Sequence, residues 1–372
     1  MLVIQEDILT RLGTGGASAG QAGLVVDELR QRGRAILTAA QQDGKRGGLP
    51  HKHLEEWRQT DISGLLAHTF VPGPTEDTPA ATTLRDQFTL GAQASAEIVL
   101  VNGVFVPGLS RVGATVGVRV WAVSQGVDAA AQADIAGHLG RYATINSNPE
   151  QGFVALNGAG VRDVVVIILP PRVVLEKPVH VLMLTTDDSI AEGTKIASYP
   201  RVLVLAQTGA QGALLETFAG PNEAVYLTNA VTEIVLGENS RLEYCRIQQE
   251  GLKAYHLATI EAHLSQGATL VSDAATLGAA LSRVDLNVRL AGAHAEATLN
   301  GLVLIGGNQH ADNHTLLDHA VEQCASHELY KHVLNDRASG VCKGKILVRP
   351  DAQKTDAKQT SRNLLLSDDA TI

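Results

Sequence analysis

Cysteine is scarce in this sequence, and long apolar runs are missing. The three cysteines, Cys245, Cys324 and Cys342, lie far apart and form no Cys-x-x-Cys pair, which does not support a structural zinc site or a four-thiolate cluster. Sparse cysteine is typical of a reducing compartment. No apolar run reaches the roughly 18 residues that a membrane helix needs, and the start, MLVIQEDILT, has no basic region before an apolar stretch. We therefore expect no membrane span and no secretory signal, and a cytoplasmic protein, or a plastid one if the source is a photosynthetic eukaryote.

Net positive charge is also lacking, because the chain carries a formal charge of −9. A general nucleic-acid binder needs a basic face to neutralise phosphates, so this class is disfavoured. Residues 331–362 are an exception, with eight Lys or Arg against three Asp. This stretch is either a solvated basic face or a docking surface for an acidic partner.

Motifs for nucleotide hydrolysis and for nucleophilic catalysis are missing as well. The Gly-rich stretch GTGGASAG (residues 13–20) has no Lys-Ser/Thr after it, and GVCKGKILV (residues 340–348) lacks the glycine spacing of a Walker A loop. No Ser-His-Asp arrangement and no G-x-S-x-G signature is recognisable. The sequence therefore predicts no catalytic residue and a protein that is not an enzyme by itself.

The first 70 residues predict a small helical region. Ser18 and Gln21 have the spacing of a capping box ahead of a helical stretch that runs to about residue 41. Pro50 then opens a second short helix, in which Leu54 and Trp57 share a face. Residues 71–85 contain three prolines and show no periodicity, which is typical of a linker. We expect residues 86–372 to form a mixed segment, with an alanine-rich helix near 128–142, that leads into a β-rich core.

That core shows the period of two that marks a half-buried strand. Residues 284–290 alternate strictly between aliphatic and polar side chains, and similar short strands are predicted near 163–169, 201–206, 225–236, 256–264 and 298–305. Turn glycines recur at Gly212, Gly237, Gly267 and Gly292, which suits one coil of a β-helix per interval. A sandwich also fits this period. The 3% aromatic content favours a narrow interior, and we predict a mainly β fold, a parallel β-helix (β-solenoid) behind an N-terminal helical region.

Histidine is concentrated between residues 294 and 332, where six of the thirteen occur. If QHADNHT is a strand, His310, Asp312 and His314 lie on one face. Two imidazoles and a carboxylate could coordinate Fe²⁺ or Zn²⁺. The alternative is a hydrogen-bonded polar ladder at a turn or at a subunit contact. These three residues are our candidate metal ligands.

Several stretches resemble the SufB/SufD family of iron–sulfur cluster assembly proteins, and its SufD branch most. The segment EEWRQTDISGLL (Glu55 to Leu66) is similar to that branch's entry segment, and LVNGVFVPGLS (Leu100 to Ser110) to its strand with an Asn-Gly turn. FVALNGAG, SYPRVLVLA and TNAVTEIVLGENSRLEY are similar too. The passage from His310 to Asp369 carries the most specific motifs, QHADNHT, SHELYKHVL, KGKILV and AQKTDAKQTSRNLLLSDDA. The SufB branch has a cysteine shortly before its leucine run, where this chain has Thr-Ser-Arg-Asn.

The resemblance implies a right-handed parallel β-helix that serves as a non-catalytic scaffold in a SufBCD-type complex. It implies a SufB-like subunit and a SufC-like ATPase as partners, with no stably bound cofactor and at most a transient iron ion or iron–sulfur cluster. In the family the leucine run is followed by further β-helix and by a C-terminal helical region, which this sequence, ending at Ile372, does not contain. Cys342 stands where the family tends to have an aromatic residue, so we carry over no ligand or catalytic residue.

The leucine run itself, Leu364, Leu365 and Leu366, is our candidate interface. Apolar surface left in water costs roughly 25 cal/mol per Å², and an uncovered strand edge invites pairing with another chain. We expect association there with a SufB-like subunit and, as the alternative, a homodimer. Two other functions stay open, a β-helix carbohydrate-active enzyme and a purely structural β-solenoid interaction protein. The first needs paired carboxylates in a groove, and none can be placed in the sequence.

Overall fold

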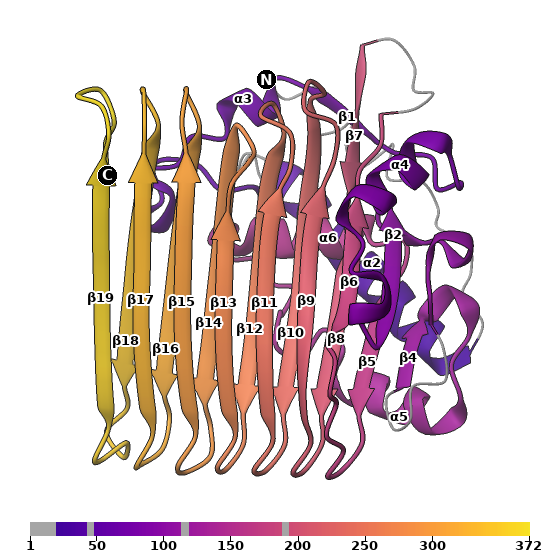
Figure 1. Ribbon diagram of the computed structural model, residues 1–372, viewed down its shortest axis with the longest axis vertical. Coiled ribbons are helices and arrows are strands. Elements are labelled where there is room, and N and C mark those ends of the chain that lie inside the picture. The colour runs from indigo at the N-terminus through magenta and orange to yellow at the C-terminus, as the bar shows by residue number, and fades with distance from the viewer. Residues whose placement is uncertain (1–19, 43–47, 113–118, 188–192) are drawn as a thin grey trace.

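The computed structural model describes residues 20–42, 48–112, 119–187 and 193–372. It confirms the expected fold, since the chain forms a β-solenoid of about six turns behind an N-terminal helical region. Figure 1 shows the solenoid from the side, with its strands stacked in order from β5 to β19. In every coil one strand joins the first sheet and the next strand joins the second.

The solenoid is built from two sheets, which we name sheet A and sheet B. In spatial order, sheet A contains β18 (Ser339–Val348), β16 (His310–His319), β14 (Leu281–Leu290), β12 (Tyr255–Leu264), β10 (Tyr226–Leu236), β8 (Arg201–Ala206), β5 (Val165–Leu169) and β4 (Arg119–Ala122), with β7 (Thr194–Ser198) and β1 (Thr69–Pro72) attached beside β10. Sheet B contains β19 (Asp356–Leu365), β17 (Ala325–Leu334), β15 (Glu296–Ile305), β13 (Thr269–Thr276), β11 (Arg241–Gln249), β9 (Gln211–Ala219), β6 (Val179–Leu184), β2 (Ala96–Val101) and β3 (Val104–Phe105).

The strands of successive coils pair in parallel, and their partner residues lie 26 to 31 residues apart in the sequence. Each coil uses two strands and two tight turns, and Gly237, Gly267 and Gly292 lie in such turns, as predicted. The prediction of a turn at Gly212 is wrong, because this residue is the second of β9. Because side chains alternate between the two faces of a strand, one set points into the solenoid and the other points outward. The inner set forms one buried apolar core between the sheets, which includes Val204, Ile234, Leu264 and Leu299.

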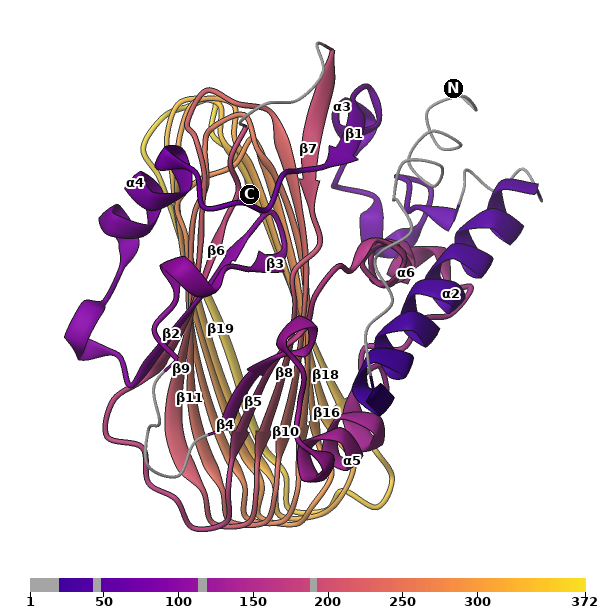
Figure 2. The ribbon, with the colours of Figure 1, turned by 90° about the vertical axis from the view of Figure 1, so that its right-hand side faces the viewer.

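The helical region covers the outer face of sheet A. Its elements are α2 (Gly20–Gln42), α3 (Ser63–Leu66), α5 (Ala129–His138) and α6 (Gly152–Gly160), together with the 3-10 turns η2 (Glu55–Trp57), η5 (Val123–Gln125) and η6 (Pro149–Gln151). Figure 2 shows α2, α5 and α6 on the side of β10, β16 and β18. A second apolar core fills this layer and joins Leu29, Trp57 and Phe153 to the outward-facing Leu203 and Leu257. Helix α2 can approach α6 closely because a Cβ at Gly33 would lie 2.4 Å from the backbone nitrogen of Ala159.

A smaller helical layer lies on the early part of sheet B. It consists of α4 (Pro79–Phe88) with η3 (Gly91–Gln93) and η4 (Pro107–Leu109). The side chains of Ala81 and Leu84 on α4 pack against Val99 and Leu182 of sheet B. Strands β11 to β19 of sheet B continue past this layer, and Figure 2 shows α4 beside the indigo-to-magenta end of the solenoid.

The expected local elements are largely present. Helix α2 and helix α5 occupy the predicted stretches, and the second short helix is the 3-10 turn η2. Residues 71–85, which we expected as a linker, contain the end of β1, paired with β7, and the start of α4, which Thr78 caps through its side chain. The division at residues 70 and 85 stays a prediction. Residues 13–19 of the Gly-rich stretch, and Ser18 of the expected capping box, lie outside the described residues.

Candidate functional site

The outer face of sheet A carries the three residues that the sequence singled out. His310, Asp312 and His314 project from β16 to this face, as their alternation predicts. The parallel register aligns them with residues of β12, β14 and β18, and we name the aligned rows the outer ladder. From one end of the strands to the other, its rows are Tyr255-Leu281-His310-Ser339, Leu257-Arg283-Asp312-Val341, Thr259-Asp285-His314-Lys343, Glu261-Asn287-Leu316-Lys345 and His263-Arg289-Asp318-Leu347.

The N-terminal segment 55–66 crosses the first rows of the outer ladder. Trp57 is 2% exposed and lies between the guanidinium of Arg283, 3.8 Å from its ring centroid, and the ring of Phe153 at 5.5 Å. Its indole N–H donates to the carbonyl oxygen of Glu150 at 3.1 Å. A buried indole needs such a partner. The sequence segment that resembles the family's entry motif therefore anchors the helical region onto the solenoid.

Arg283 is the central cation of the outer ladder. Its guanidinium donates to both carboxylate oxygens of Asp285 at 2.8 and 3.1 Å, to Asp312 at 2.6 Å and to the carbonyl oxygen of Glu56 at 2.7 Å. Burial lowers the pKa of Arg283, but the two neighbouring carboxylates more than offset this, so the pKa is raised. A buried guanidinium with this number of acceptors is a fixed structural charge.

The carboxylates of Asp312 and Glu56 are also paired with basic groups. Burial alone would raise the pKa of Asp312, but the hydrogen bond with His314 and the charge of Arg283 lower it below its ordinary value. His314 Nε2 lies 2.9 Å from Asp312, and Lys343 forms an ion pair of 2.8 Å with Glu56. Burial also raises the pKa of Glu56, and the hydrogen bond and charge of Lys343 more than reverse that.

A hydrogen-bond chain links His310 to Asp312 through Thr60. The Thr60 hydroxyl donates to Asp312, so it accepts from His310 Nε2, which lies 3.2 Å away. His310 Nδ1 then accepts from the Ser339 hydroxyl at 2.7 Å. This arrangement needs a neutral imidazole, and burial does lower the pKa of His310. The chain ties residue 60 to a strand that begins 250 residues later.

These residues thus form a hydrogen-bonded polar ladder, which lies within β16 under the N-terminal segment rather than at a turn. Among the described residues, no group of three or more His, Cys, Asp or Glu side chains is arranged to hold a metal ion. A transient iron contact of His310, Asp312 and His314 stays a prediction. The three cysteines are free thiols, and burial raises the pKa of each one, which keeps them protonated at neutral pH.

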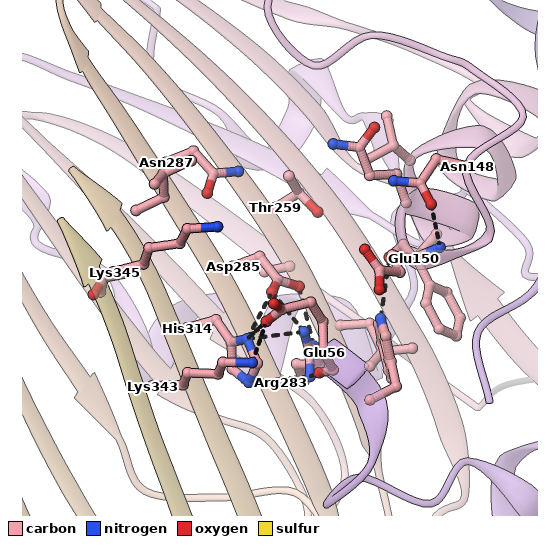
Figure 3. A pocket seen from close by; sticks show the side chains of 18 residues that line it. Glu56, Asn148, Glu150, Thr259, Arg283, Asp285, Asn287, His314, Lys343 and Lys345 are labelled. Atoms are coloured by element: carbon pink, nitrogen blue, oxygen red, sulfur yellow. Dashed lines mark hydrogen bonds and ion pairs between the residues drawn. The ribbon is translucent and has the colours of Figure 1, made fainter. Parts of the chain in front are cut away.

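A pocket of about 240 Å³ opens beside these residues, between sheet A and the helical region (Figure 3). Its strand side carries Thr259, Asp285, Asn287 and Lys345, and its helical side carries Glu56, Asn148 and Glu150 (Figure 3). Phe153, Val154 and Leu257 form its apolar floor. The pocket therefore exists only because the N-terminal region folds back over the later coils.

A second polar cluster, which we did not predict from the sequence, lies inside the solenoid. Arg246, His256 and Glu250 are at most 3% exposed. Arg246 contacts His256 Nε2, and the Glu250 carboxylate lies 2.5 Å from His256 Nδ1. Since a guanidinium can only donate, Nε2 accepts and Nδ1–H points to Glu250. Burial lowers the pKa of His256, so a neutral imidazole joins the two opposite charges in the interior.

The candidate interface lies on the outer side of the last coil of sheet B. Leu364 aligns with Val333 and Leu304 and faces outward, whereas Leu365 aligns with the buried Leu334 on the inner face but is itself 43% exposed. Leu364 and Leu366 are 55% and 57% exposed. The basic stretch 331–362 is divided by the strand alternation and by the two sheets. Lys343 and Lys345 project from sheet A, and Lys331 and Arg362 from sheet B.

Comparison with known proteins covers nearly the whole chain. Residues 27–181 match the family model of the SufBD protein N-terminal region, and residues 189–372 match that of the SUF system FeS cluster assembly SufBD core domain. An iron–sulfur cluster assembly SufBD family protein of Synechocystis is 30% identical over 87% of this chain and 71% of its own length. The iron–sulfur cluster assembly protein SufD of Escherichia coli is 29% identical over 86% of this chain and 71% of its own length.

Proposed function

The chain belongs to the SufBD family of iron–sulfur cluster assembly proteins, and on this premise we propose that it is a non-catalytic, SufD-like scaffold subunit. It acts in a complex with a SufB-like subunit and a SufC-like ATPase, in the cytoplasm or, in a photosynthetic eukaryote, in the plastid. A relative from Arabidopsis thaliana, 28% identical over 59% of this chain, carries the name "Protein ABCI7, chloroplastic". Within the described residues, no helix has both the length and the apolarity to cross a membrane.

The observation that carries the scaffold proposal is the apolar outer face of the last coils of sheet B. Leu302 and Leu304 of β15 are 42% and 50% exposed, and Leu364 and Leu366 are exposed beside them. Residues Leu304, Val333 and Leu364 align across three neighbouring strands. Contiguous exposed aliphatic side chains of this kind mark a protein–protein contact. We place the SufB-like subunit on this face, with a second copy of the chain as the alternative occupant.

The polar sites of the described residues support a structural role rather than a catalytic one. In the outer ladder, Arg283, Asp312 and Glu56 each have partners of opposite charge within 3 Å. Groups that perform acid–base or nucleophilic work need one partner position left for a substrate. Iron or an iron–sulfur cluster then binds the complex only transiently. We propose that His310, Asp312 and His314 are the residues of this chain that contact it.

Co-expression with SufB-like and SufC-like proteins tests the proposed complex. The chain should co-purify with both, and the double variant Leu364→Ser/Leu366→Ser should lose the SufB-like subunit. A matched control is Leu252→Ser/Val174→Ser, because these side chains are 57% and 65% exposed at turns of the solenoid. Sedimentation of the isolated chain tests the alternative occupant, a second copy of the chain. If the native chain self-associates through this face, the double variant should be monomeric. Equal recovery of the SufB-like subunit with both double variants would refute the proposed face.

ATP hydrolysis by the isolated chain tests the non-catalytic role. The chain should release no phosphate above a buffer blank, since neither glycine-rich stretch has the spacing of a phosphate-binding loop. ATP hydrolysis that persists through stringent purification, and that a substitution in this chain abolishes, would show that the chain is an enzyme.

A further inference from the structure

The pocket beside Glu56 continues into a second hollow along the outer face of sheet A. This neighbour has a volume of about 380 Å³ and is lined by Arg141, Tyr142, His263, Arg289 and Asp318. The two hollows share Asn287 and Leu316, which stand in the fourth row of the outer ladder. Together they form one groove, which we name the ladder groove, bounded by the strands of sheet A and by residues 141–154 of the helical region.

The carboxylates of the ladder groove are already matched by cations. Asp285 forms an ion pair with Arg283, and Glu56 forms one with Lys343. The two carboxylate oxygens of Asp318 accept hydrogen bonds from Nε and Nη2 of Arg349, each at 2.8 Å. Glu261 lines the second hollow and accepts a hydrogen bond from the side-chain amide of Asn287 at 2.7 Å. Burial raises the pKa of Glu261 to about 8, so it is largely neutral at physiological pH.

Three cations of the ladder groove remain in excess. Lys345 and Arg141 are exposed, and neither side chain has an ion pair among the described residues. Arg289 is 51% exposed and lies 3.9 Å from Asp318, which Arg349 already neutralises. Figure 3 shows the ammonium group of Lys345 directed toward the hollow, beneath Asn287. Among the described residues, Glu150 and Glu261 are the lining carboxylates without an ion pair, and Glu261 is largely neutral. The groove is therefore net positive on a protein of charge −9.

The shape of the ladder groove selects the kind of ligand. A small-molecule site is usually an enclosed and mostly apolar cavity that buries most of its ligand. The ladder groove is elongated and open to solvent, and its lining is rich in charged side chains. Its cations are distributed along its length, with Lys345 on β18, Arg289 on β14 and Arg141 after α5. An extended chain with several negative charges fits this distribution better than a compact anion does.

We propose that the ladder groove is a docking site for an extended acidic segment of a partner protein. Lys345, Arg289 and Arg141 bind the carboxylates of that segment, and Tyr142, His263 and Leu316 contact its aliphatic parts. The site is distinct from the leucine face of sheet B, so one chain can hold two partners at once. It goes beyond the scaffold role and stands on the geometry of this chain alone.

Binding of a fluorescently labelled synthetic peptide of alternating glutamate and glycine tests the docking site. Fluorescence anisotropy on the full chain should show saturable binding that weakens as salt is raised, because exposed charges are screened. Since the whole chain is negative, a generally charged surface would repel this probe. The triple variant Lys345→Ala/Arg289→Ala/Arg141→Ala should weaken binding about tenfold or more, because three ion pairs are lost together.

A matched control carries the same loss of charge on sheet B. The triple variant Lys331→Ala/Lys358→Ala/Arg362→Ala removes three exposed cations from β17 and β19, and it should bind the peptide as the native chain does. Equal weakening in both triple variants, or none in the groove variant, would overturn the proposal. Inorganic tripolyphosphate serves as a competitor. Displacement of the peptide by tripolyphosphate at concentrations equal to those of unlabelled peptide would show a small-anion site and also overturn it.

Discussion

The outer faces of sheet A and sheet B arise from the same strand alternation but differ in what they expose. Sheet A buries charged residues, and sheet B exposes leucines. On sheet A most outward residues of β12 to β18 are polar or charged. Arg283 and Asp312 are nevertheless only 2% and 1% exposed, because the helical region covers them. On sheet B the outward residues of β15 to β19 include three leucines, Leu302, Leu304 and Leu364, that are 42% to 55% exposed. Burial on the outside of this solenoid therefore follows from what covers a face, and not from the polarity of its residues.

The two outer faces also differ in their energetic roles. Buried ion pairs are costly to break, since the remaining charge has no water to solvate it. Exposed leucines contribute little to folding, because they stay in water in both states. We thus expect sheet A's outer face to dominate stability and sheet B's outer face to dominate association. Four substitutions, each paired with a control on the opposite face, test this contrast.

Arg283→Ala should have the largest effect. It leaves Asp312 and Asp285 without their main cation and removes the contact with Trp57, and it should lower the free energy of unfolding by about 3–5 kcal/mol. The matched substitution on sheet B is Arg241→Ala, which removes an exposed pair with Glu243 and should cost less than about 1 kcal/mol. Urea unfolding followed by circular dichroism measures both. Similar losses in the two variants would show that the outer ladder is not a buried ionic network.

Thr60→Val should be the next most severe change. The substitution keeps the shape of the side chain but removes the hydroxyl that links His310 to Asp312, so two buried groups lose a partner. We expect a loss of about 1–3 kcal/mol in the free energy of unfolding. Thr360→Val on the exposed outer side of β19 is the control and should be nearly neutral. Proteolysis of the segment 55–66 should also become faster in the Thr60 variant only.

Glu261→Gln should remove one contribution to the pH dependence of stability. The pKa of Glu261 is raised to about 8 by burial and by the charges of Glu233 and Asp285, and the hydrogen bond from Asn287 does not offset this. An unfolded glutamate titrates near about 4.3. The folded chain holds this proton more tightly between those values, so Glu261 makes stability fall as pH rises from about 4 to 8. The variant cannot ionise and should gain more than about 1 kcal/mol over the native chain on going from about pH 5 to 9.

The control for this pH dependence is Glu243→Gln on the outer face of sheet B, whose side chain is 59% exposed. Its stability difference from the native chain should stay constant over the same pH range. A Glu261 variant that tracks the native chain at every pH would show that this carboxyl is ionised in the folded state.

Leu364→Ser should have the smallest effect on folding. Its side chain is 55% exposed, so the free energy of unfolding should change by less than about 0.5 kcal/mol. Leu257→Ser makes the same change on the outer face of sheet A, where the side chain is 2% exposed, and should cost at least about 2 kcal/mol. If Leu364→Ser unfolds the chain as readily as Leu257→Ser does, the leucine face belongs to the core rather than to an interface.

Much of the solenoid could be predicted from local patterns. The period of two in residues 284–290 identifies a strand, because strand alternation is a local property of the backbone. The glycines at 237, 267 and 292 identify turns, whereas Gly212 lies in β9. The same alternation placed His310, Asp312 and His314 on one face. Their partners Arg283, Lys343, Thr60 and Glu56 could not be predicted in this way, since they lie on other coils or in the N-terminal segment.

The leucine run shows that residues adjacent in the sequence need not share one face of a strand. The sequence presents Leu364, Leu365 and Leu366 as one apolar unit, but consecutive residues of a strand point to opposite faces. The structure therefore places Leu365 on the inner face, in line with the buried Leu334, and Leu364 on the outer face. All three leucines of the run are nevertheless exposed, Leu365 at 43%. The basic stretch 331–362 divides for the same reason, so only Lys343 and Lys345 take part in the pocket on sheet A.

The sequence by itself determined the strand period, the turn positions, the absence of a phosphate-binding loop and the family resemblance, because each depends on residues close together in the chain. Only the tertiary structure decided that a charged strand face would be buried, that Trp57 would cover Arg283, and that two hollows would join into one groove. The physical reason is that burial and pKa depend on contacts across coils and across 250 residues of chain. No local pattern specifies which segment will exclude water from which face.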